Sequence, residues 1–375
     1  MLVGIAILGG AAAIAVWSGF TNHSKEQIFR VSGFSMAPTL YGDYQIMSCP
    51  QCSTQTKVAT ESASALAASA RTAECWHCGA KFKCDSDAID SHVIEGDLVQ
   101  VSGIGPTSGK RIRIGDIVAV RVDGIMRVKR ILGLPGDVVS VNQRRLLVNG
   151  RRLEIVLAES NGGNDAALID VDIDQQRSDS RWADATEGGD SDWLVYHHRS
   201  VYEHSRTSEI YDDYPCNVDV IRQLDPVDQL AVTLSLAAAA TIDVAFYSDN
   251  GTRIATRQHV ANEPLTITIG QAELAETIAL TPQTPIAIRV RDEQAQGEQS
   301  QDKQGKRVQW NDLRVRRSVE YRLRRRDSDA VYPLQLNQDE CFIVGDNVPI
   351  SVDSRDFGPL PMDNIVGFAR RLTWE

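Results

Sequence analysis

The chain has 375 residues, of which 42% are hydrophobic and 24% are charged. This balance excludes a disordered chain, a collagen-like repeat and a small disulfide scaffold. The 50 acidic and 39 basic side chains give a formal net charge of −11, which disfavours general nucleic-acid binding, so we expect no nucleic-acid partner. The length allows about two or three domains, each with a core of its own.

The first element along the chain is an apolar segment, 2–20, that contains no charged residue. As a helix with a rise of about 1.5 Å per residue it would span ~28 Å, close to the ~30 Å of a bilayer core. We therefore predict a transmembrane anchor over 1–22, with the lipid bilayer as a partner. A cleaved secretory peptide is the alternative, but that class carries a basic region before its apolar stretch, and none is present here.

Two cysteine pairs follow, with the spacing Cys49-x-x-Cys52 and Cys75-x-x-Cys78. Two such turns separated by a gap of this length fit a tetrahedral site of four thiolates, which predicts a structural Zn²⁺. Four protein ligands leave no position for a reactive water. Disulfides are the alternative if this part of the protein faces an oxidising compartment. The Thr/Ala/Ser-rich stretch 53–73 is expected to loop out between the two turns.

Short strands dominate the prediction beyond the cysteines. Gly-Asp turns lead into β-branched runs at Asp97, Asp116 and Asp137. Further strand-like runs lie at 218–221, 230–236, 242–247, 265–269 and 286–290. Long amphipathic helical patterns are scarce, so the fold class is mainly β, and the later runs suggest an inserted β-sandwich. The acidic stretch 157–192 has little periodicity and is predicted to be a loop or linker.

An arginine-rich run, 314–326, alternates in part with Val315, Val319, Tyr321 and Leu323. We interpret it as one solvated face of a strand; contact with anionic lipid headgroups is the alternative. The pair His197-His198 is expected to be solvated or structural rather than catalytic. Cys84, Cys216 and Cys341 have no regular spacing and are expected to be buried apolar residues.

Three segments carry the chemistry: 31–40 around Ser35, 127–137 around Lys129, and 345–358. A serine hydroxyl is a poor nucleophile until a neighbouring base takes its proton. Lysine can be that base only when neutral, so its pKa must fall from about 10.4, and burial among apolar side chains lowers it. On composition alone an exposed strand lysine beside Arg127 and Arg130 is the favoured interpretation, because the local alternation assigns no face to Lys129.

In this order and after an apolar segment, the three segments resemble the boxes of type I signal peptidases. Those enzymes are membrane-bound serine proteases that use a Ser-Lys dyad on a mostly β catalytic domain. The resemblance implies that Ser35 is the nucleophile and Lys129 the general base. It also implies that Ser351 supports the lysine and that the structure of the site is held by Asp346, Asp353 and Arg355. Gly33 stands where some members have a serine donor, which leaves the Ser35 N–H as the expected oxyanion donor.

The resemblance implies cleavage of secretory preproteins after small residues, at junctions of the Ala-x-Ala type, without a catalytic cofactor. It places the protein in the cytoplasmic membrane as a single-pass protein, with the catalytic domain on the extracytoplasmic side. A self-cleaving regulator with the same dyad would need a DNA-binding module. The other alternative is a catalytically inactive membrane scaffold that presents its inserted parts to partners. Intact Ser35, Lys129 and Ser351 argue against the scaffold.

The predicted organisation is a signal-peptidase-like β domain interrupted twice. Its parts are the anchor at 1–22, the discontinuous protease domain at 23–48, 85–150 and 336–375, the zinc-ribbon insertion at 49–84, and the β-rich, sandwich-like insertion at 151–335.

Overall fold

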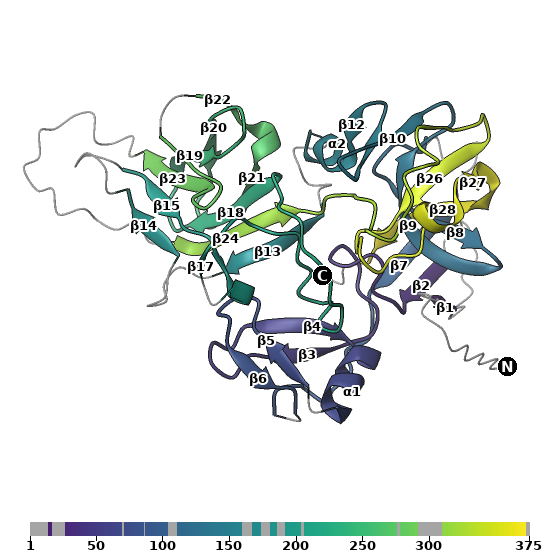
Figure 1. Cartoon of the computed structure of the whole chain (residues 1–375), viewed down its shortest axis with the longest axis horizontal. Coiled ribbons are helices and arrows are strands. Elements are labelled where there is room, and N and C mark those ends of the chain that lie inside the picture. Colours follow the sequence, from purple (N-terminus) through teal and green to yellow (C-terminus); the bar gives the residue numbers. More distant parts are fainter. Residues whose placement is uncertain are drawn as a thin grey trace, which may run out of the picture.

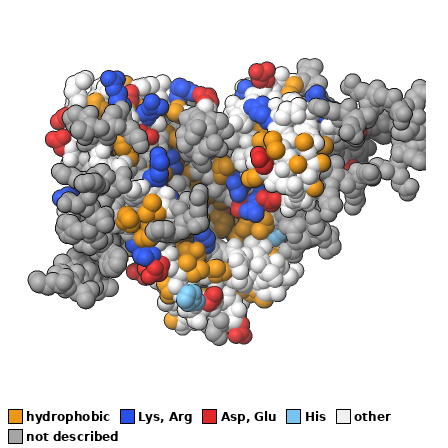
Figure 2. Space-filling view, turned by 180° about the vertical axis from the view of Figure 1, so that it is seen from behind, with side chains coloured by type: hydrophobic (Ala, Val, Ile, Leu, Met, Phe, Trp, Pro, Cys, Tyr) orange, Lys and Arg blue, Asp and Glu red, His pale blue; other side chains and the backbone are white. Residues whose placement is uncertain are grey.

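The computed structural model consists mainly of β-strands arranged in three lobes (Figure 1). It describes residues 14–16, 27–69, 71–85, 87–103, 111–159, 167–173, 181–185, 192–203, 206–275, 278–291 and 310–372. The α-helices among them are short: α1 (Thr60–Ala68), α2 (Leu153–Glu159) and α3 (Ser354–Phe357). The predicted mainly-β class is therefore confirmed. Viewed from behind, the lobes meet around a hollow where apolar side chains are exposed (Figure 2).

The largest sheet is antiparallel and is built from segments that are far apart in sequence. Its strand order is β1 (Ile14–Val16), β2 (Gln27–Val31), β7 (Leu98–Gly103), β28 (Ile365–Arg371), β8 (Ile117–Val122), β9 (Ile125–Gly133), β26 (Glu340–Val344) and β27 (Leu360–Pro361). The pairing of β9 with β26 sets Arg130 opposite Val344. It thereby brings the lysine segment beside the segment that begins at Gly345.

Strand β9 lies inside this sheet and is covered on both faces. Its last six residues, 128–133, are all buried. Val128 packs into a cluster with Met36 and Leu40, whereas Ile131 packs into a different cluster. This is why the local sequence shows no alternation that could assign the face of Lys129.

A smaller sheet adjoins it, with the order β12 (Arg151–Arg152), β11 (Arg145–Val148), β10 (Val138–Asn142) and β25 (Leu334–Gln335). The strands predicted after Asp97, Asp116 and Asp137 are β7, β8 and β10, so those predictions are confirmed.

A two-sheet sandwich forms the second lobe. One sheet has the order β13 (Leu168–Ile173), β24 (Trp310–Ser318), β18 (Leu230–Leu236) and β21 (Leu265–Thr268). The other has the order β14 (Trp182–Asp184), β15 (Leu194–Tyr196), β23 (Ile286–Arg291), β19 (Ala240–Phe246), β20 (Arg253–His259) and β22 (Glu273–Leu274). Side chains of both sheets, such as Val232 and Val244, share one apolar core. Four of the predicted runs are strands, but 218–221 is not.

The stretch 157–192 is not simply a loop, because β13 and β14 lie within it. The acidic residues suggested a solvated loop, but two of the aspartates in β13 pair with basic side chains of other elements. Asp170 pairs across the strands with Arg316 at 2.7 Å, and Asp172 is buried 3.2 Å from His77.

The third lobe contains the four paired cysteines. Hairpin β3 (Tyr44–Ser48) and β4 (Gln55–Ala59) is followed by α1 and by hairpin β5 (Thr72–Glu74) and β6 (Lys81–Lys83). The stretch 53–73 therefore does not loop out. Its apolar residues Val58, Ala63 and Leu66 form a small core with Met47.

The described residues include no helix long and apolar enough to cross a membrane. The anchor predicted over 1–22 lies outside the described residues, except for β1. There the structure has a strand rather than a helix, since Ile14 pairs with Val31 of β2.

The interpretation of the arginine run as a solvated face holds only in part. Arg314 and Arg316 are half-exposed on β24 and alternate with buried Val315, whereas Arg317, Arg322 and Arg324 are buried. The guanidinium groups of the buried arginines donate to main-chain carbonyls, including Pro226 O at 2.7 Å from Arg322 and Ser351 O at 2.8 Å from Arg324.

Candidate active site

Ser35 lies in a turn that directly follows β2. Met36 beside it is only 1% exposed and Ala37 is also buried, while Ser35 itself is half-buried. The turn is closed by hydrogen bonds from the Ala37 N–H to Phe34 O and from the Leu40 N–H to Met36 O, each 3.0 Å. Burial of the apolar residues therefore anchors the turn and leaves the serine at its accessible side.

Lys129, on β9, is 1% exposed, and its Nζ donates to Ser351 Oγ at 2.9 Å. Burial is the main cause that lowers the pKa of Lys129 to about 8, helped by Arg127 and Arg355 and opposed by Asp353. The exposed-lysine alternative is excluded by this burial. An amine with such a pKa is partly neutral near neutral pH, as a general base requires.

Gly345 allows the serine turn and the lysine pocket to approach each other. A Cβ at this position would lie 2.1 Å from Ser351 Oγ and 2.4 Å from Ser35 O. The Asn347 N–H donates to the same Ser35 carbonyl at 3.0 Å. The structure thus brings Ser35, Lys129 and Ser351 together around one glycine.

Asp353 and Arg355 form a buried pair at the start of α3, with Arg355 Nη2 2.7 Å from Asp353 Oδ2. The same Asp353 oxygen accepts the Gly345 N–H at 2.9 Å. Burial opposes ionisation of Asp353, but the Arg355 guanidinium outweighs it and lowers the pKa of Asp353 to about 2. The pair therefore fixes the chain next to Ser351.

Asp346 connects all three predicted segments. Its carboxylate accepts hydrogen bonds from Arg130 at 2.8 and 2.6 Å, from the Tyr321 hydroxyl at 2.7 Å, and from the Thr39 hydroxyl. Burial opposes ionisation, but Arg130 outweighs it and holds the pKa of Asp346 below its usual range. None of these partners was predicted from the sequence. Thr39 and Arg130 lie inside two of the three segments, but Tyr321 comes from the arginine run and had no local signal.

The four paired cysteines form a compact cluster in the third lobe. The Sγ atoms of Cys49 and Cys78 are 3.7 Å apart and those of Cys52 and Cys75 are 3.6 Å apart, and all four lie within 4.8 Å of one another. Sulfurs around a tetrahedral zinc with bonds of about 2.3 Å would be ~3.8 Å apart. A disulfide requires about 2.05 Å. The cluster could therefore hold a metal ion.

His198 and the three remaining cysteines are expected to have no catalytic role. His198 is buried against the Tyr196 hydroxyl, and burial followed by Arg181 lowers the pKa of His198 to about 3. Cys84 and Cys341 are fully buried, as predicted, whereas Cys216 is only half-buried.

Comparison with known families agrees with this geometry. The family model for signal peptidase, peptidase S26, matches residues 5–191 and 277–374, well over half of the chain. The unmatched part between them falls in the sandwich, inside the insertion predicted over 151–335. No curated protein matches the chain. The family match confirms the resemblance of the three segments to signal peptidases, a class of proteolytic enzymes. The chain belongs to the signal peptidase family, peptidase S26.

Proposed function

We propose that the protein is a membrane-bound serine endopeptidase that removes signal peptides from exported preproteins, with Ser35 as nucleophile and Lys129 as general base. The observation that carries the proposal is the buried Lys129 amine, held by Ser351 beside the Ser35 turn. Burial supplies a neutral lysine amine at a pH where proteins work, because it penalises the charged form.

In the proposed reaction the Ser35 hydroxyl oxygen attacks the scissile carbonyl and its proton passes to Lys129 Nζ. The resulting ammonium gives that proton to the leaving amine, which releases the mature protein. A water molecule, deprotonated by the same amine, then hydrolyses the acyl-enzyme and frees Ser35. No catalytic cofactor is needed.

The Ser35 N–H is the proposed donor to the oxyanion that forms during attack. Its position depends on the turn, which is held by buried Met36 and by the hydrogen bond between Asn347 and Ser35 O. Gly33 offers no side-chain donor.

Family resemblance supports the substrate class: secretory preproteins cut after small side chains, of the Ala-x-Ala type. It also supports a place in the cytoplasmic membrane with the catalytic domain outside. A substrate held in the same bilayer by its own apolar segment would meet the enzyme in two dimensions. No nucleic-acid partner is proposed.

The proposal includes a structural Zn²⁺ bound by Cys49, Cys52, Cys75 and Cys78. The spacing of the four sulfurs supports a closed tetrahedral site. Purified protein should contain about one zinc per chain, and Cys52→Ser should lose it while Cys341→Ala keeps it. A protein without zinc and with these four thiols oxidised would support disulfides instead.

Cleavage of a purified preprotein in detergent tests the enzyme. Wild type should cut at the Ala-x-Ala junction, and Ser35→Ala and Lys129→Ala should each lose activity by at least about 10³-fold. Lys81→Ala, which removes an exposed lysine of the third lobe, should cut like wild type. If folded, zinc-loaded wild type is as inactive as the two variants, the catalytically inactive scaffold becomes the better reading.

A further inference from the structure

A loop of the sandwich lobe, 212–225, runs against the active site. It lies in the part of the chain that the family match leaves out. Its Tyr214 hydroxyl donates to Asp346 O at 3.0 Å. Three residues further on, Asn217 Nδ2 donates to Asn347 Oδ1 at 2.7 Å, and Asn347 Nδ2 donates back to Asn217 Oδ1 at 2.9 Å. The two amides therefore form a reciprocal pair across the boundary between the lobes.

Asn347 stands between two residues of the catalytic centre. Its N–H donates to Ser35 O at 3.0 Å, and its carbonyl accepts the Ser351 N–H at 2.9 Å. Asn347 is fully buried, so its amide must find partners within the protein. Any shift of this residue would change the position of Ser35 relative to Ser351, and hence relative to the Lys129 amine.

The loop is itself held from two sides, so Asn217 is a fixed partner. Toward the third lobe, Ser62 of α1 donates to Asp219 at 3.0 Å, and Val218 packs against the small core there. Toward the sandwich, the Arg317 guanidinium lies 5.0 Å from the centre of the Tyr214 ring. Both lobes thus brace the loop against the catalytic centre.

We infer that Asn217 is a positioning residue of the active site: it holds Asn347, and through Asn347 it sets the placement of Ser35 against Ser351. The sandwich lobe is then a working part of the enzyme rather than only an attachment. This inference rests on the proposed function.

The test is the steady-state kinetics of Asn217→Ala, expressed per folded molecule. The value of kcat should fall about 10–100-fold with little change in KM, because the change misplaces the nucleophile without touching the substrate. Asn217→Asp keeps the acceptor for Asn347 Nδ2 and should recover part of the loss. The matched control is Asn311→Ala, which breaks another asparagine pair, Asn311 with Asn262, on the surface of the sandwich; its kcat should equal that of wild type.

A double-mutant cycle with Asn347→Ala checks that the two residues act as one unit. The double variant should lose little more activity than the worse single variant. Additive losses, or a kcat of Asn217→Ala within twofold of wild type, would overturn the inference.

Hydrogen exchange provides a readout that does not depend on activity. In Asn217→Ala, amides of 33–37 and 347–351 should exchange faster, while those of the sandwich strands stay unchanged. If wild type proves inactive, the proposed function fails, but this measurement still tests the placement. Unchanged exchange at both segments would overturn the positioning role by itself.

Discussion

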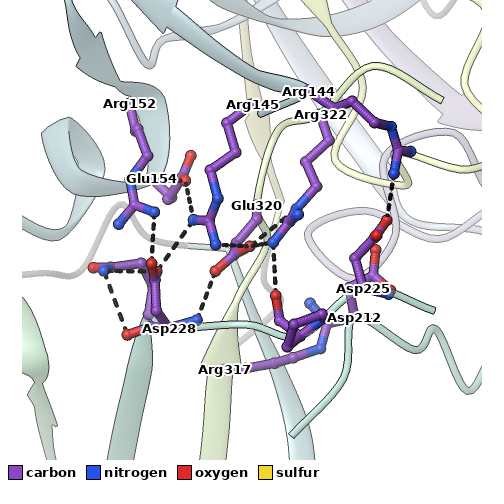
Figure 3. A network of polar contacts seen from close by, with 12 residues as sticks. Arg144, Arg145, Arg152, Glu154, Asp212, Asp225, Asp228, Arg317, Glu320 and Arg322 are labelled. Carbon is purple, nitrogen blue, oxygen red and sulfur yellow. Dashed lines mark hydrogen bonds and ion pairs between the residues drawn. The ribbon is translucent and has the colours of Figure 1, made fainter. Parts of the chain in front are cut away.

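Two regions of the molecule bury charges of both signs, and they treat those charges differently. In the candidate active site, the charge of neighbouring arginines keeps Asp346 and Asp353 ionised. At the junction between the small sheet and the sandwich, arginines from several elements surround Glu154 and Glu320 (Figure 3). There burial is the main cause that raises the pKa of Glu154 to about 8 and that of Glu320 to about 7.

The distances explain the difference for Glu154. Its nearest guanidinium nitrogens belong to Arg152 at 3.5 Å and Arg145 at 3.7 Å, and its oxygens accept no side-chain hydrogen bond from the described part of the chain. Asp353 instead accepts two bonds from Arg355 at 2.8 and 2.7 Å. Burial decides the charge of Glu154, whose contacts are long, and pairing decides that of Asp353, whose contacts are short. A short contact is not sufficient at Glu320, because Arg322 donates to it and burial, followed by the charge of Asp228, still raises its pKa. Burial also prevails at Lys129, because its short contact is to an uncharged hydroxyl.

The largest loss of stability should follow from breaking the buried ion pair between Asp346 and Arg130. Asp346→Asn would leave the Arg130 guanidinium buried without its counter-charge, and we expect a loss of about 3–5 kcal/mol in unfolding free energy. Urea denaturation measures it. Asp170→Asn, which breaks the half-exposed pair with Arg316, should cost less than about 1 kcal/mol. Equal losses in both variants would contradict the comparison.

Adding one atom to the active site should nearly stop the reaction. Gly345→Ala places a Cβ against Ser351 Oγ and Ser35 O. Ser351 and Ser35 must therefore move apart to make room for it. We expect cleavage of a signal-peptide substrate to fall at least about 100-fold, as misplacement by about 1 Å does elsewhere. Gly103→Ala meets nothing within 4 Å and should keep full activity. A fully active Gly345→Ala would show that the short contacts are dispensable.

The pH profile should report the lysine. Below a pKa of about 8 Lys129 is mostly an ammonium and cannot accept a proton, so kcat/KM should rise about tenfold from pH 7 to pH 9. Arg127 helps to lower this pKa, so Arg127→Ala should move the midpoint to higher pH. Arg121→Ala, at an exposed position of β8, should leave it in place. A profile that is flat over this range would exclude Lys129 as the titrating base.

The smallest change in stability should come from Glu154, at the junction between the small sheet and the sandwich. The pKa of Glu154 is raised from 4.5 to about 8 on folding, so the folded state binds more protons than the unfolded state between these values. Its contribution to stability is therefore full below pH 4.5 and is lost as pH rises towards 8. Glu154→Gln cannot ionise and should be more stable than wild type at pH 8, by about 1 kcal/mol or more. The gain should shrink at pH 5. If Glu154→Gln is less stable than wild type at pH 8, then pairing with arginine, not burial, decides the charge of Glu154.

Much of the architecture was readable from local sequence. Glycine turns and β-branched runs predicted β7, β8, β10 and most of the sandwich strands, because these signals act between near neighbours. Three of the errors share one cause. The segments 53–73, 157–192 and 314–326 look polar, but their charged and small residues meet partners distant in sequence, as Asp170 meets Arg316.

The sequence by itself determined which reactive groups this protein offers: a serine and a lysine inside segments that resemble the signal-peptidase boxes, and four cysteines at a spacing that suits a metal site, since residue type and local spacing decide which atoms can react or bind. Only the tertiary structure decided the state of those groups. The burial of Lys129, the closeness allowed by Gly345 and the pairing of Asn217 with Asn347 depend on strands and loops brought together from across the chain. Desolvation and hydrogen bonding act over a few ångströms in space, however many residues separate the partners along the chain.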